Sequence, residues 1–150
     1  MLAMAIPAGA QQSPPSTHVA ITAAELKWGA PPPTLAKGAM FAVVSGDPGK
    51  AGPFTIRLKL PAGYKIGLHW HPTDENVTVL SGTFALGMGE KFAPAALKSL
   101  PAGGYGLLPA EMRHFAMAKT AAIVQVHGTG PFVLNYVNPA DDPSKAPAAK

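Results

Sequence analysis

At 150 residues, the chain is long enough for one domain with a sizeable hydrophobic core. Charged residues make up only 13% of it, and the Lys and Arg side chains behind the net charge of +4 are scattered, which argues against a nucleic-acid interface. The absence of cysteine excludes disulfides, thiolate catalysis and cysteine zinc sites, and no apolar run is long enough to span a membrane.

The N-terminal residues have the pattern that ends an export signal. Residues 1–10 are apolar and uncharged, and Ala8-Gly9-Ala10 has the small-x-small form of a signal-peptidase site, although no positively charged region precedes it. The pattern predicts a periplasmic or secreted protein; the alternative is an apolar tail. Residues 11–39 are predicted to form a linker or N-terminal arm that begins with a Pro/Ser-rich stretch.

Short strands separated by turns are predicted for residues 40–137. Seventeen prolines and sixteen glycines break the chain into short pieces. The stretch FTIRLKL at 54–60 alternates apolar and polar residues, which is the period of a strand with one buried face. The other predicted strands are residues 40–45, 65–71, 76–81, 83–89, 104–109, 114–118, 121–127 and 132–137, and residues 93–98 compete as a helical turn. This spacing predicts an all-β sandwich or barrel, followed by a tail or arm at 138–150.

The stretch HWHPTDE at 69–75 carries the main chemical signal. On a strand, His69 and His71 project from the same face, and Pro72 ends the pairing, so that Glu75 can return beside the two imidazoles after a turn. Two imidazoles and a carboxylate at this spacing can bind one metal ion. The alternative is a set of hydrogen-bonded histidines without a metal.

A fourth ligand should come from a separate strand, and His114, just after a predicted turn at 109–113, is the best candidate. Asp74 and Glu75 are less suited to act as an acid/base pair, because adjacent residues of an extended chain face apart.

The strand at 121–127 leaves two orientations open. Gln125 and His127 share one face, and Val124 and Val126 share the other. If the valines pack outside, His127 points into the interior, where it could serve as a base or as a hydrogen-bond partner of a ligand. If the valines pack in the core, His127 lies on a polar outer face. The alternation alone favours neither.

The stretch GYKIGLHWHPTDENVTVLSG at 63–82 resembles the first motif of the cupin superfamily, G-x5-H-x-H-x3-E-x6-G, at every defined position. The second cupin motif, G-x5-P-x-G-x2-H-x3-N, is matched in part by residues 103–118. Glu111 stands where that motif has Gly, and Ala118 where it has Asn. These departures bear on the tight turn and the strand end more than on His114.

The resemblance implies a single-domain antiparallel jelly-roll β-barrel with an extended N-terminal segment. It also implies one divalent transition metal (Cu, Fe, Mn, Zn or Ni) bound by His69, His71, Glu75 and His114, and it suggests a homodimer. Such a site favours a metal-dependent oxidoreductase, dioxygenase- or oxidase-like, that acts on a small organic or sugar substrate. The alternatives are a non-redox isomerase or lyase, with His127 as the base to test, and a non-catalytic metal- or ligand-binding sensing module.

Overall fold

The computed structural model describes residues 18–145. The predicted export signal at 1–10 and the start of the predicted linker lie outside these residues. The strands are β1 (Met40–Ser45), β2 (Gly52–Leu60), β3 (Lys65–Trp70), β4 (Glu75–Ser81), β5 (Thr83–Met88), β6 (Lys98–Pro101), β7 (Tyr105–Leu108), β8 (His114–Ala118), β9 (Ala122–Gly130) and β10 (Asn135–Tyr136). Four short 3-10 helices complete the described chain: η1 (Ala23–Glu25), η2 (Pro94–Ala96), η3 (Pro139–Asp141) and η4 (Pro143–Lys145).

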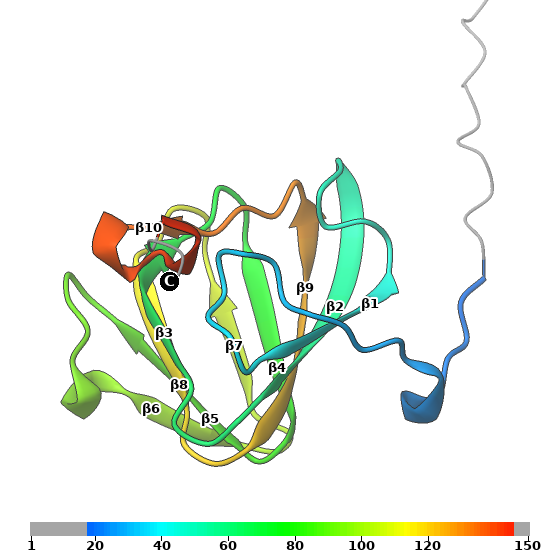
Figure 1. Cartoon of the computed structure of the whole chain (residues 1–150), viewed down its shortest axis with the longest axis horizontal. Coiled ribbons are helices and arrows are strands. Elements are labelled where there is room, and N and C mark those ends of the chain that lie inside the picture. The colour runs from blue at the N-terminus through cyan, green and yellow to red at the C-terminus, as the bar shows by residue number, and fades with distance from the viewer. Residues whose placement is uncertain (1–17, 146–150) are drawn as a thin grey trace, which may run out of the picture.

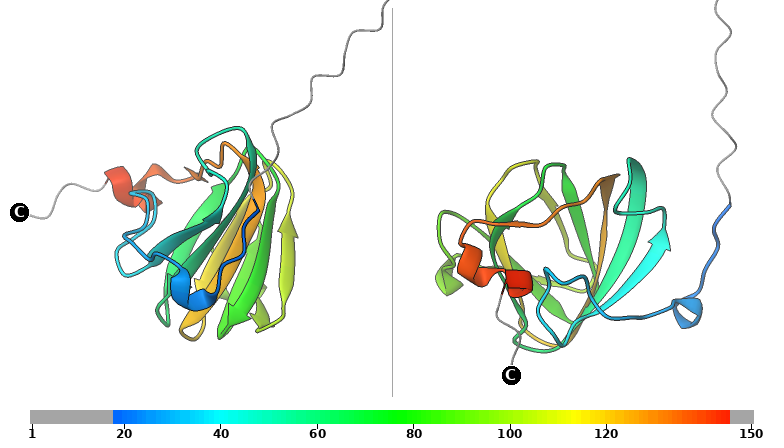
Figure 2. Two further views of the ribbon diagram at one scale, coloured as in Figure 1. Left: turned by 90° about the vertical axis from the view of Figure 1, so that its right-hand side faces the viewer. Right: turned by 45° about the horizontal axis from the view of Figure 1, so that its top comes forward.

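The strands form two antiparallel five-stranded sheets that face each other (Figures 1 and 2). One sheet has the order β1-β2-β9-β4-β7 and the other β10-β3-β8-β5-β6. Successive strands mostly alternate between the two sheets, which is the connectivity of a jelly roll. The predicted all-β antiparallel jelly roll is therefore confirmed. No helix among the described residues is long and apolar enough to cross a bilayer.

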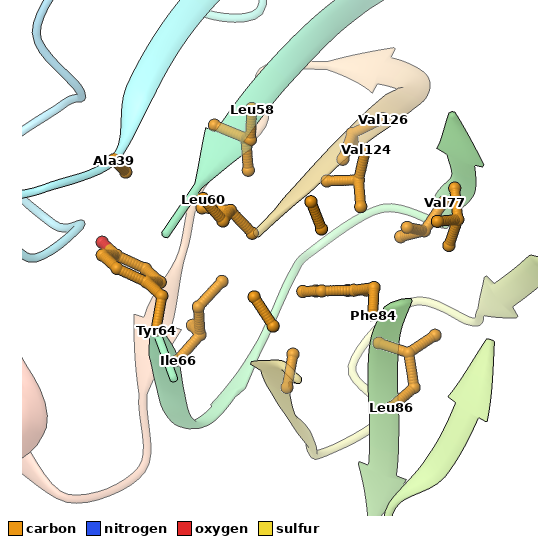
Figure 3. Close-up of a cluster of buried hydrophobic side chains, with 14 of the residues drawn as sticks. Ala39, Leu58, Leu60, Tyr64, Ile66, Val77, Phe84, Leu86, Val124 and Val126 are labelled. Atoms are coloured by element: carbon orange, nitrogen blue, oxygen red, sulfur yellow. The ribbon is translucent and has the colours of Figure 1, made fainter. Parts of the chain in front are cut away.

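Alternation along β2 and β9 builds the core between the sheets. Leu58 and Leu60 of β2 point inward with Val124 and Val126 of β9 (Figure 3). Each such side chain contributes about 1.5–3 kcal/mol when it is fully removed from water. The valines of β9 thus occupy the core rather than the outer face, which decides the orientation that the sequence left open.

Two segments outside the strands also pack on the sheets. Leu26 and Leu35 of the N-terminal arm are buried, whereas residues 18–25 are exposed. At the other end, the segment between β9 and β10 crosses one end of the sheets (Figures 1 and 2). Strand β6 was not predicted, because it follows the Ala-rich stretch and ends in a proline, and it pairs only with β5 at the sheet edge.

The turn before β8 keeps its shape without the glycine of the second cupin motif. Glu111 adopts a positive φ of 64°, the left-handed conformation that glycine takes most easily. Its backbone N–H donates to the carbonyl of His71 over 2.7 Å, and Met112 N–H donates to Pro109 O over 3.1 Å. The backbone of Glu111 therefore keeps a strained conformation, and the turn that contains it packs against the end of β3.

We predict that Glu111→Gly stabilises the protein by about 1 kcal/mol, because glycine relieves the left-handed strain while part of the gain is lost to unfolded-chain entropy. Glu111→Ala, which removes the same carboxylate but keeps the strain, is the matched control and should give no such gain. The measurement is the free energy of unfolding in urea. A glycine variant no more stable than the alanine variant would contradict the strain.

Candidate metal centre

A β-bulge in β3 turns the first histidine toward the interior. In the pairing of β3 with β8, Ile66 lies opposite Ala116 and His69 opposite His114, so β3 carries one extra residue between these pairs. Ile66 and His69 therefore both line the interior, although regular alternation would place them on opposite faces. Regular alternation would instead place Leu68 on the same face as Ile66. Leu68 is buried but does not line the cavity.

The turn between β3 and β4 returns the chain so that Glu75 lies beside His71. The Asp74 carboxylate accepts a hydrogen bond from Ala110 N–H over 2.8 Å, which ties this turn to the one before β8. Asp74 is thus a turn residue. Glu75 begins β4 and pairs with Gly128 of β9, where a Cβ atom would lie only 2.7 Å from the Asp74 carbonyl. Gly128 therefore permits the close approach that seats Glu75.

The structure brings His69, His71, Glu75 and His114 together. One possible ligand atom from each of the four lies within 4.8 Å of the others. All four side chains are buried, with exposed fractions of 3%, 2%, 8% and 1% in that order. The Glu75 carboxylate lies 3.3 Å from His71 Nε2 and 3.2 Å from His114 Nε2. These are the four residues expected to bind a metal.

Backbone carbonyls fix which nitrogen of each histidine faces the cluster. The Nδ1 atoms of His69, His71 and His114 lie 2.6, 2.8 and 2.9 Å from the carbonyl oxygens of Gly67, Val133 and Met112. A carbonyl can only accept, so each neutral ring carries its proton on Nδ1 and keeps a lone pair on Nε2.

Within the described residues, the buried Nε2 atoms of His71 and His114 have no hydrogen-bond partner. A buried polar atom left unpaired costs about 1–3 kcal/mol. A metal ion bound by three Nε2 atoms and a carboxylate would satisfy them, and this donor set suits a divalent transition metal. The residues present therefore fit such an ion.

Burial and mutual repulsion keep the cluster poor in protons. Burial lowers the pKa of His69 to about 3, and the neighbouring His114 and His71 add to the effect. Burial raises the pKa of Glu75, whereas a proton on Nε2 of His114 or His71 would lower it through a hydrogen bond to the carboxylate. The site is thus arranged as neutral imidazole beside carboxylate, the protonation state that metal ligands need.

An apolar cavity of about 180 Å³ opens above the cluster. Its lining includes His69, His71 and Glu75, and among the described residues Thr34 contributes the only other polar side chain. The remaining lining residues are Pro32, Leu35, Phe41, Pro48, Gly49, Ile56, Leu58, Ile66, Val126, Phe132 and Leu134. Tyr64 and Tyr136 donate their hydroxyls to the carbonyls of Ala36 and Thr34, over 2.6 and 2.8 Å, and so hold the N-terminal arm at this wall.

His127 does not join the site. It is exposed on the outer face of β9, since Val124 and Val126 fill the core, and it lines no part of the cavity. The neighbouring Gln125 accepts a hydrogen bond from Arg57 Nε on that same outer face, over 3.0 Å. Of the two orientations that the sequence left open, the structure shows the one in which His127 lies on the outer face, so His127 is not placed to act as a base or ligand partner at the cluster.

The sequence analysis did not predict the residues that contact His71 from a distant part of the chain. Phe132 stacks on the His71 ring, with 4.3 Å between ring centroids, and Val133 supplies the carbonyl for its Nδ1. Both follow the cis Gly130–Pro131 bond in the segment after β9. Nothing in their spacing from His71 signals the contact, although Phe132 is the aromatic residue that begins the predicted strand at 132–137.

We predict that the metal-free protein loses stability as the pH falls below about 6.5. The folded pKa of His69 lies below its ordinary value, so the unfolded chain takes up a proton first and the slope is about 1.4 kcal/mol per pH unit down to about pH 3. Urea unfolding of chelator-treated protein across this range measures the slope.

His69→Asn should flatten this slope, whereas His127→Asn, which removes an exposed histidine on the outer face, should leave it unchanged. An unaltered slope in the His69 variant would contradict the proposed cost of burying that ring.

The sequence matches no protein-family profile and no curated protein, whereas comparison with solved structures finds several similar folds. A protein described as a putative acetylacetone dioxygenase from Methylibium petroleiphilum superposes with a TM-score of 0.66 at 20% identity, over 89% of this chain and 90% of that one. The polyketide cyclase RemF from Streptomyces resistomycificus gives 0.69 at 14% identity, over 86% and 92%.

An acetylacetone dioxygenase from Acinetobacter johnsonii gives a TM-score of 0.66 at 14% identity, over 91% of this chain and 88% of that one. An RmlC-like cupin from Shewanella frigidimarina gives 0.58 at 16% identity, over 76% and 91%. At these identities the likeness concerns the fold. Together with the four clustered side chains and the matched first motif, it shows that this chain has the cupin fold.

Proposed function

We propose that this protein is a metal-dependent oxidoreductase of the dioxygenase type, acting on a small and largely apolar organic molecule. The observation that carries the proposal is that the His69, His71, Glu75 and His114 cluster borders an apolar cavity, which three of its residues, His69, His71 and Glu75, line. A divalent metal held there would supply Lewis-acid and redox chemistry, with coordination positions left for substrate and dioxygen. Similar folds include two proteins described as acetylacetone dioxygenases.

The residues of the chain have two tasks in this proposal. The carbonyls behind each Nδ1 hold the three rings with Nε2 toward the ion, and Glu75 supplies one negative charge that offsets the charge of a divalent cation. The apolar walls exclude water, which strengthens electrostatic interactions within the site.

The cavity lining favours an apolar substrate over a sugar. Apart from the ligands and Thr34, its side chains can neither donate nor accept hydrogen bonds. Each sugar hydroxyl buried there without a partner would cost about 1–3 kcal/mol. A molecule that carries its oxygen atoms at one edge could direct them to the metal and leave its carbon skeleton against the walls.

The same lining bears on the non-redox alternative. An isomerase or lyase needs a base near the open side of the site, and the residue considered for that role, His127, lies outside. The likeness to a polyketide cyclase keeps a non-oxidative reaction as an outcome of the experiment. A binding or sensing module would bind metal and ligand without turnover.

We predict that protein purified without added metal contains copper, iron or manganese and consumes dioxygen with acetylacetone but not with glucose. Element analysis and an oxygen electrode measure the two properties. His114→Ala should lose both metal and oxygen uptake while it keeps its β-sheet circular dichroism, because the core is built by other residues. His127→Ala, the matched control on the outer face, should keep both.

Zinc-containing protein without oxygen consumption would contradict the oxidoreductase proposal. Turnover of substrate in the absence of dioxygen would favour the non-redox alternative.

A further inference from the structure

His71 differs from the other two histidines in the origin of its hydrogen-bond partner. The carbonyls that accept from His69 and His114 belong to Gly67 and Met112, each two residues earlier in the chain. The carbonyl that accepts from His71 Nδ1 belongs to Val133, 62 residues away. Val133 lies in residues 131–134, called here the crossing segment because this part of the chain runs across one end of the sheets (Figure 2).

The crossing segment also covers one face of the His71 ring. The Phe132 ring lies 4.3 Å from it, with an angle of only 21° between the planes. Phe132 is held in turn by Phe54, at 5.0 Å between ring centroids, and by its backbone N–H, which donates to Pro48 O over 2.7 Å. One short segment therefore controls both the orientation of the His71 ring and the space beside it.

Less strand pairing supports the segment that holds the His71 ring than supports His69 and His114. His69 and His114 face each other in the β3–β8 ladder, so backbone pairing holds their strands in register. The crossing segment leads only into β10, which has two residues and pairs with the end of β3. Short pairing of this kind opens more easily than a ladder at the centre of a sheet.

Phe132 and Leu134 of the crossing segment are at the same time part of the cavity wall. A molecule in the cavity would therefore touch the segment that holds the His71 ring.

We propose that Phe132 is a positioning residue for His71, and that its place in the crossing segment makes His71 the most readily displaced of the three histidine ligands. The inference rests on the metal site of the proposed function. Partners that orient a metal-bound histidine typically change metal affinity about 10- to 100-fold when they are removed.

The first test uses Co²⁺-loaded protein. Phe132→Leu should alter the visible spectrum of the bound cobalt and speed its release to EDTA about 10-fold, because the His71 ring loses its stacking partner. Phe132→Tyr, which keeps the ring, should retain the wild-type spectrum and release rate. Phe41→Leu is the matched control, since Phe41 lines the same cavity but takes part in no ring contact with a histidine among the described residues.

A Phe132→Leu spectrum and release rate identical to those of the wild type would overturn the proposal. So would equal changes in Phe41→Leu, because they would show a general effect of the cavity wall.

A second measurement needs no substitution. In Zn²⁺-loaded, ¹⁵N-labelled protein, the imidazole N–H of His71 should exchange with solvent faster than those of His69 and His114. Exchange of His71 that is as slow as, or slower than, that of the other two would overturn the proposal. Neither test consumes dioxygen, so their outcome is separate from that of the oxidoreductase assay.

Discussion

Three hydrogen bonds from histidine Nδ1 atoms to backbone carbonyls are the interactions on which the site depends. They place the proton of each neutral ring on Nδ1 and leave the Nε2 lone pairs of His69, His71 and His114 available to a metal ion. Because the acceptors are main-chain atoms, the orientation follows from the fold itself: the bulge in β3, the turn before β8 and the segment that crosses one end of the sheets. A change in the bulge, in the turn or in the crossing segment would reorient a histidine ring even if none of the four cluster residues were substituted.

The apolar surroundings give the cluster its chemical character. Burial in a cavity with hardly any other polar group lowers the pKa of His69 and leaves Nε2 atoms without a partner. An apoprotein with this arrangement keeps an energetic cost that a bound cation would remove. The same surroundings limit the substrate, because any polar atom that enters must find its partner at the metal or remain unpaired.

Much of this architecture could be predicted from the sequence. The i, i+2 spacing of His69 and His71, the proline after them and the return at Glu75 predict three convergent ligands, and the strand alternation at 54–60 matches the burial of β2. The motif departure at Glu111 proved compatible with the expected turn, since a non-glycine residue can occupy the left-handed region at a modest cost.

Alternation could not orient β9, because a strand of alternating valines and polar residues fits either face until its neighbours are known. The bulge at β3 and the contact of Phe132 with His71 depend on long-range register, which local patterns do not contain.

The most direct test of the account is a crystal structure of the metal-loaded protein, with anomalous scattering recorded at the absorption edge of the metal. We expect one anomalous peak bonded to the Nε2 atoms of His69, His71 and His114 and to the Glu75 carboxylate, with the Nδ1 contacts to the three carbonyls unchanged. A peak at another position, or coordination through Nδ1 by any of these histidines, would contradict it.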